Sequence, residues 1–239
     1  MNTCLALLLT VAFMFTASGV YAEVRVTDKL LQKGVFTSPE CAGASDCLCE
    51  ADIHYPVFSG LLNPETQDQL NDGSRKSAEQ LKCQGKPAEA AGGNDHFSVK
   101  HTYEVTFQSQ KLTGLKFVDW AYEGGAHGNS MVDGLILDNN SGKILSLAEI
   151  LGSHSAEVNH VIYETLAPKS DGIFRDEIEN RKDSFIKDGK CKGCTIILSK
   201  EGVQVVFQAY EVAPFVDGNP AVTIPAQYIA YPAIAQAFK

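Results

Sequence analysis

One long alternating segment constrains the fold more than any other part of this sequence. Between residues 97 and 107 the polar side chains are separated by apolar and aromatic ones at every second position: Phe97, Val99, His101, Tyr103, Val105 and Phe107. A period of two predicts a long strand with one buried face. A turn near Lys111 and a second strand over 115–122 follow, and a third strand is expected over 131–137, so the segment predicts an antiparallel sheet.

Helix signals occur in separate stretches of the chain. Asn63-Pro64-Glu65 combines an N-cap residue, a proline for the first turn and an acidic residue, and the helix is expected to reach Lys82. Ser146 and Glu149 have the spacing of a capping box. Because helices and strands come in separate runs, we predict an α+β fold. We expect an antiparallel sheet with helices packed on one face and two small, intimately packed subdomains stapled by disulfides.

Two boundaries divide the predicted chain. Residues 1–22 are interpreted as a signal peptide, because an apolar run is followed by small residues before Glu23, and the run is shorter than the ~20 residues that span a bilayer. The glycine-rich link over 84–95 separates an N-terminal α+β subdomain (23–95), which holds a Cys-rich loop, from a C-terminal α+β domain (96–239). In the first we expect a short strand over 24–26 and an edge strand over 51–58.

The net charge and the predicted signal peptide restrict where the protein is expected to be located and which partners it is expected to bind. The net charge is −9, and residues 1–22 contain no Asp, Glu, Lys or Arg, so cleavage would leave the charge unchanged. An acidic surface disfavours nucleic acid and anionic lipid and favours a basic partner. We therefore expect a periplasmic or secreted protein that has no integral membrane anchor once the signal is removed.

The cysteines predict a disulfide framework. Of seven cysteines, Cys4 lies in the leader, and an even number remains in an exported chain, which is typical of disulfides: Cys41, Cys47, Cys49, Cys83, Cys191 and Cys194. Cys191 and Cys194 form a CxxC followed by a β-like segment, so a local structural disulfide is favoured over a redox pair. The other four are expected to pair among themselves, and a Cys49–Cys83 bond would tie a strand to the helix after it.

The candidate functional surface is the stretch 119–130, which contains the only tryptophan, a histidine and three glycines. Glycines allow a tight loop between strands. Such a loop would display the candidate contact residues Trp120, Tyr122, Glu123, His127 and Asn129. The structural alternative is that Trp120 belongs to the core and His127 holds the turn.

Catalytic motifs give little support to an enzyme. The sequence contains no GxSxG, HExxH, phosphate loop or dinucleotide fingerprint, so neither a metal nor a cofactor is expected. Asp119, Glu123 and Asp133 lie near the loop and leave glycoside hydrolysis open as an alternative, in which Glu123 or Asp119 would act with His127. A non-enzymatic binding protein is the leading interpretation.

Several segments resemble a known family. These are Tyr122–Gly128 (Tyr-Glu-Gly-Gly-Ala-His-Gly), Asp138–Leu147, Phe207–Gly218 and Thr223–Pro225, with Ile53–Asn63 before them. They are similar to the extracytoplasmic domain shared by the lysozyme-sensing anti-sigma factor RsiV and the non-catalytic part of the peptidoglycan deacetylase PdaC.

The resemblance implies a binding module of the cell envelope. In the sensor this module binds lysozyme, which adds Pro214 and Phe215 to the contact residues, because the loop 213–220 then joins 120–129 as a candidate surface. We expect a protein that binds or inhibits a lysozyme-like hydrolase, or that senses envelope stress. Cell-wall glycan is the other candidate ligand, and an immunity protein against an envelope-targeting toxin is a further alternative.

Overall fold

The computed structural model describes residues 23–37, 48–84 and 96–238. The expected signal peptide, Cys41, Cys47 and most of the expected link over 84–95 lie outside these residues. No helix within these ranges is long and apolar enough to cross a membrane.

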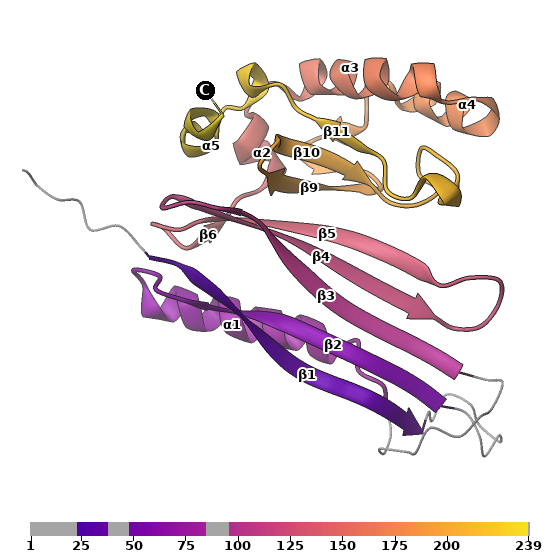
Figure 1. The fold of residues 1–239 in the computed structure, drawn as a ribbon. Coiled ribbons are helices and arrows are strands. Elements are labelled where there is room, and N and C mark those ends of the chain that lie inside the picture. The colour runs from indigo at the N-terminus through magenta and orange to yellow at the C-terminus, as the bar shows by residue number, and fades with distance from the viewer. Residues whose placement is uncertain (1–22, 38–47, 85–95, 239) are drawn as a thin grey trace, which may run out of the picture.

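The larger sheet of the described chain has six strands that follow one another in chain order. They are β1 (Arg25–Thr37), β2 (Leu48–Ser59), β3 (His96–Gln108), β4 (Leu112–Tyr122), β5 (Asn129–Asp138) and β6 (Lys143–Ile144). Every neighbouring pair is antiparallel except β2 and β3, which run parallel. The strands expected on either side of the link 84–95 therefore belong to one continuous sheet (Figure 1).

The remaining strands are shorter. A second sheet has the order β11 (Ala221–Thr223), β10 (Gly202–Phe207) and β9 (Cys194–Ser199), and β7 (Ile186–Lys187) pairs with β8 (Lys190–Cys191). The helices are α1 (Pro64–Glu79), α2 (Leu147–Leu151), α3 (Ser155–Leu166), α4 (Gly172–Arg181) and α5 (Pro232–Ala237), with 3-10 turns η1 (Ala167–Lys169), η2 (Phe215–Asp217) and η3 (Ala226–Tyr228). The mixed α+β class is as predicted.

The elements stack in layers (Figure 1). Helix α1 packs against β2 on one face of the six-stranded sheet. The second sheet lies on the opposite face and is covered in turn by α3 and α4. The alternation along β4 explains this arrangement, because Leu115 and Phe117 pack into a cluster with Leu70 of α1 while Val118 packs against Ile197 of β9. The largest buried cluster lies between the second sheet and the helices α2 to α5.

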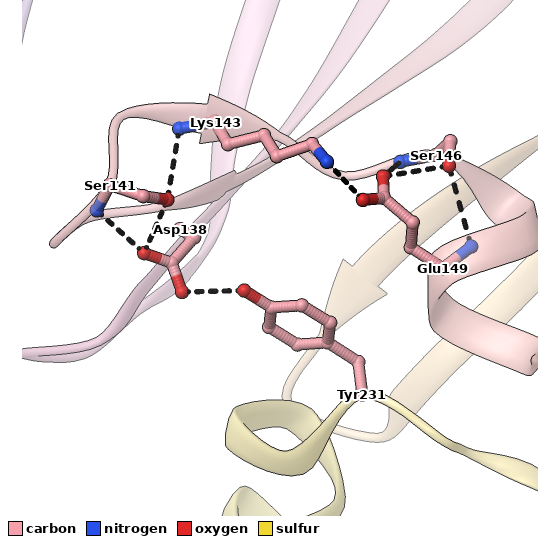
Figure 2. Close-up of polar contacts among 6 residues, drawn as sticks. All are labelled: Asp138, Ser141, Lys143, Ser146, Glu149 and Tyr231. Carbon is pink, nitrogen blue, oxygen red and sulfur yellow. Dashed lines mark hydrogen bonds and ion pairs between the residues drawn. The ribbon is translucent and has the colours of Figure 1, made fainter.

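Local sequence signals set where two of the helices begin. The Asn63 side chain accepts hydrogen bonds from the backbone N–H groups of Glu65 and Thr66, as expected for the N-cap of α1. The predicted capping box is formed between Ser146 and Glu149. Figure 2 shows how this box continues into a polar network that links the β5–β6 turn to the start of α5: Asp138, Ser141, Lys143, Ser146, Glu149 and Tyr231. The Lys143 ammonium and the cap hydrogen bonds lower the pKa of Glu149 to about 2.

Two expectations for the N-terminal part were wrong. The first strand is not a short piece over 24–26, because β1 pairs with β2 along its whole length, from Arg25 to Thr37. The segment 51–58 is not an edge strand either, since β2 lies between β1 and β3. The proline is accommodated because pairing with β3 ends at Ile53, so that Pro56 has a strand neighbour on one side only.

Two disulfides join described residues. Cys49 on β2 is bonded to Cys83, just after α1, as expected from the sequence. Cys191 and Cys194 form the local disulfide between β8 and β9. The first fixes the end of α1 to the sheet, and the second closes the turn that leads into the second sheet.

Candidate functional site

The β4–β5 hairpin ends in a tight glycine turn. Gly124 and Gly125 both have positive φ angles, of 96° and 95°, a conformation that other residues rarely adopt. The Tyr122 hydroxyl donates a hydrogen bond to the Gly125 carbonyl at 3.1 Å, which ties the strand end to the turn. The sequence motif therefore builds the tip of the hairpin.

Trp120 is half-buried and packs on its own hairpin. Its ring stacks with that of Tyr122 at 6.5 Å between centroids, and the Lys100 ammonium lies 5.5 Å from the ring centroid. A Cβ at Gly128 would lie 2.4 Å from the indole ring, so only glycine fits beside it. Trp120 stabilises the tip and leaves part of its surface exposed.

The tip meets the β10–β11 loop through three rings, which we call the ring cluster: His127, Tyr210 and Phe215. The His127 and Phe215 rings stack with centroids 4.1 Å apart. The Tyr210 hydroxyl lies 3.3 Å from His127 Nε2, and Nδ1 of the same ring donates to the Gly128 carbonyl at 3.0 Å. Tyr210 is 54% exposed. The predicted contact residues His127 and Phe215 are thus brought together, and Tyr210 is an addition that the sequence reasoning missed.

The other predicted contact residues surround this cluster. Glu123, Asn129 and Pro214 are exposed. Within the described chain, the Glu123 carboxylate makes no ion pair or side-chain hydrogen bond, so it is available to solvent or to a partner. Val216, next to Phe215, is 86% exposed.

A buried arginine holds the loop that carries Tyr210 and Phe215. Arg181 is 5% exposed and pairs with Glu211 at 3.0 Å, and it also donates to the Lys192 carbonyl inside the CxxC turn. The Gln208 side chain bonds both the N–H and the carbonyl of Val132 on β5. These contacts fix the β10–β11 loop relative to the hairpin.

A groove lies between α1 and the face of the six-stranded sheet that points away from β9. It encloses about 380 Å³ and is lined by Gln69, Leu70, Gly73, Ser74 and Ser77 of α1, His101, Phe117, Asp119, Asp133, Gly134 and Leu135 of the sheet strands, and Ile144 of β6. We call it the α1 groove. A second hollow of about 480 Å³ adjoins it at Asp119 and extends to Glu123, His127 and Asn129.

The floor of the α1 groove carries a histidine–aspartate pair. His101 is 4% exposed, and its Nδ1 hydrogen-bonds the Asp119 carboxylate across the β3–β4 register. Its ring stacks on Phe117 at 5.8 Å. The sequence contained a signal for this site, because a histidine on the apolar face of a strand needs a buried partner.

This arrangement gives limited support to catalysis. An Asp–His pair bonded through Nδ1 has the orientation of a general base. Neither Ser74 nor Ser77 hydrogen-bonds His101 within the described chain, so no activated nucleophile accompanies it. Asp119 has His101 as its partner, whereas His127 belongs to the ring cluster and contacts Tyr210 and Phe215. No group of three or more His, Cys, Asp or Glu placed to hold a metal ion occurs in 23–37, 48–84 or 96–238.

One segment of the chain is similar to a known protein family. Residues 43–130 match the family model of the deacetylase PdaC. The matched segment contains β2, α1, β3 and β4, and therefore the helix and three of the seven sheet residues that line the α1 groove: His101, Phe117 and Asp119. A search of curated proteins gives no significant match.

Solved structures resemble the chain over most of its length. A crystal structure of a DUF3298-family member from Bacteroides fragilis has a TM-score of 0.61 at 15% identity, covering 92% of this chain and 98% of that one. A DUF3298-family protein from Pseudomonas aeruginosa has a TM-score of 0.54 at 18% identity, with 88% and 96% covered. At these identities the likeness shows the fold alone. The chain thus combines a PdaC-like segment with a DUF3298-like fold.

Proposed function

We propose that this chain is an exported, non-catalytic binding protein whose ring cluster contacts a basic, lysozyme-like cell-wall hydrolase. The observation that carries the proposal is the stacking of His127 on Phe215, which joins the two loops 120–129 and 213–220 in one surface. Rigid aromatic side chains supply contact area at low entropic cost and are enriched among residues that dominate binding energy.

Charge supports a basic partner. The chain has a net charge of −9, and Glu123 extends from the hairpin tip beside the ring cluster. Opposite charges at a rim steer the encounter of two proteins and lose their effect as salt increases. Binding should therefore weaken with ionic strength mainly through slower association.

The test is calorimetry of the chain with hen-type lysozyme and, separately, with soluble muropeptides. Lysozyme should bind, and Phe215→Ala should weaken binding about tenfold or more because it removes the stacked centre of the surface. Val216→Ser tests the same surface with an exposed side chain whose loss leaves the fold intact. The matched control is Leu62→Ser, a change at an equally apolar residue that is 47% exposed near the start of α1.

Three results would change the assignment. Absence of heat with lysozyme and with muropeptides would remove the proposal. Equal binding by Phe215→Ala, Val216→Ser and Leu62→Ser would move the contact surface elsewhere. Turnover of purified peptidoglycan that is lost in Asp119→Asn or Glu123→Gln would instead favour the glycan hydrolase.

A further inference from the structure

Helix α1 leaves a hollow where a helix normally closes over a sheet. Its apolar contacts fall into two clusters, one with Leu70 near the middle of the helix and one with Ala78 near its C-terminal end, followed by Leu81 after the helix. Between them the groove is lined by Gly73, Ser74 and Ser77. Nothing lies within 4 Å of the position where a Cβ on Gly73 would stand. Small and polar residues thus keep open a space that larger apolar side chains would fill.

The polar lining of this space is rich in acceptors. Asp119 and Asp133 are among the described residues that line it, and neither lysine nor arginine is. Asp133 Oδ1 already accepts from the Gly134 N–H and the Thr195 hydroxyl, whereas its Oδ2 makes no hydrogen bond within the described residues. The His101 ring uses Nδ1 for Asp119, and in the neutral ring this leaves Nε2 as an acceptor. No hydrogen bond to Nε2 is present within the described ranges, although His101 is only 4% exposed. The groove therefore lacks a donor that carries positive charge.

The apolar part of the lining offers side chains that an alkyl chain can contact. Leu70, Leu135 and Ile144 line the walls, and Phe117 provides an aromatic ring beside the carboxylates. An alkylammonium group would place its cationic head at Asp119 and Asp133 and its methylene groups along these side chains. The adjoining hollow contains Glu123 and Lys100 and leads towards the hairpin tip.

We infer that the α1 groove is a binding site for an alkylammonium group. Asp119 and Asp133 would accept from the ammonium, and His101 would accept a further hydrogen bond through Nε2. The group could belong to a free diamine or to a lysine side chain of a peptide. The site lies beneath α1 and does not include Tyr210 or Phe215, so the inference is independent of the hydrolase proposal.

Titration with 1,5-diaminopentane, followed by calorimetry and by amide chemical shifts, tests the site. The neutral analogue 1,5-pentanediol has the same length and should not bind. A short peptide with one lysine, compared with the same peptide carrying acetyl-lysine, distinguishes a side chain from the free diamine. Tighter binding of the lysine peptide than of the diamine would assign the group to a protein partner.

Two substitutions locate the binding in the groove. Gly73→Leu would fill the open space on α1 without removing a contact, and it should abolish diamine binding while the chain stays folded. Asp119→Asn should weaken binding on the order of tenfold to a hundredfold, because it removes a charge-assisted acceptor. Asp176→Asn is the matched control, since it removes one exposed carboxylate from α4 in another layer of the fold and should leave binding unchanged.

Three results would overturn the inference. Equal weakening by Asp119→Asn and Asp176→Asn would show attraction to the overall negative charge and not to a site. Unchanged binding in Gly73→Leu would place the diamine outside the groove. Saturable binding of the neutral diol or of an N-acetylglucosamine oligomer, without binding of the diamine, would also overturn it.

Discussion

The two faces of the six-stranded sheet are packed very differently. On the face towards β9, a Cβ on Gly134 would lie 1.9 Å from the Ile196 carbonyl oxygen, and one on Gly114 would lie 2.6 Å from that of Leu198. Val118 and Val132 contribute to an apolar cluster there. On the face towards α1, a Cβ on Gly73 would meet open space, and the floor carries His101 and Asp119.

The same strands form both the closely packed interface with β9 and the floor of the α1 groove. Successive residues of β4 point to opposite faces, so Val118 packs between the sheets while Asp119 lines the groove. Close packing of the two sheets provides stability and a fixed register. That rigid support allows the other face to keep a polar pair and an unfilled cavity, neither of which contributes much to folding.

Gly134→Ala should have the largest effect on stability. The added methyl group would overlap the Ile196 backbone, which cannot move without displacing β9 from β5. Overpacking typically costs about 1 to 3 kcal/mol, and overlap with backbone places this change at the upper end of that range. Urea unfolding followed by circular dichroism measures the loss of free energy.

The matched control for this change is Gly73→Ala, which adds the same methyl group on the opposite face. It should raise the free energy of unfolding by roughly 0.5 to 1 kcal/mol, because alanine is the better helix former and the space is open. Similar losses in both variants would contradict the contrast between a close-packed face and an open one.

Sequence patterns predicted those parts of the fold that depend on neighbouring residues. The alternation from Phe97 gave β3, Asn63 gave the start of α1, and the glycine motif gave the hairpin turn. The length of β1 could not be read in this way. Its sequence has no strict alternation, and it is held by pairing with β2 across the chain.

The candidate site was predicted in part for the same reason. His127 and Phe215 were named separately, and only the packing of β10 and β5 brings their rings together. His101 and Asp119 are paired by the β3–β4 register, which the sequence does not specify to one residue. The α1 groove depends on how far a helix stands from a sheet, a property of tertiary packing that leaves no local pattern.

Asp119→Ala and a double substitution together test the polar floor. The single change leaves His101 buried without its carboxylate partner and should cost roughly 1 to 3 kcal/mol of unfolding free energy. Replacing both residues, as His101→Leu with Asp119→Leu, should recover most of this loss because no buried polar group is left unpaired. A double variant less stable than Asp119→Ala would mean that the pair itself stabilises the fold, and the contrast between the faces would weaken.

A more exposed histidine gives the smallest predicted effect and a direct comparison with His101. His54 on β2 contacts Asp28 at 2.7 Å and Asp52 at 3.0 Å, and its side chain is 27% exposed. The hydrogen bond with Asp28 raises the pKa of His54 above its usual value of 6.5, and the bond with Asp52 adds to the shift against the effect of burial.

The sign of the pH dependence follows from this shift. Because the folded pKa is above the unfolded one, the contribution of His54 is fully present below the unfolded pKa and is lost as pH rises through the folded pKa. His54→Gln should therefore be less stable than the wild type at about pH 5 by under ~1 kcal/mol, and the gap should close towards about pH 8.5. Urea midpoints of both proteins across this range measure the gap. A gap that does not change with pH would show that His54 stabilises β1 and β2 as a neutral hydrogen-bonding group and not through its charge.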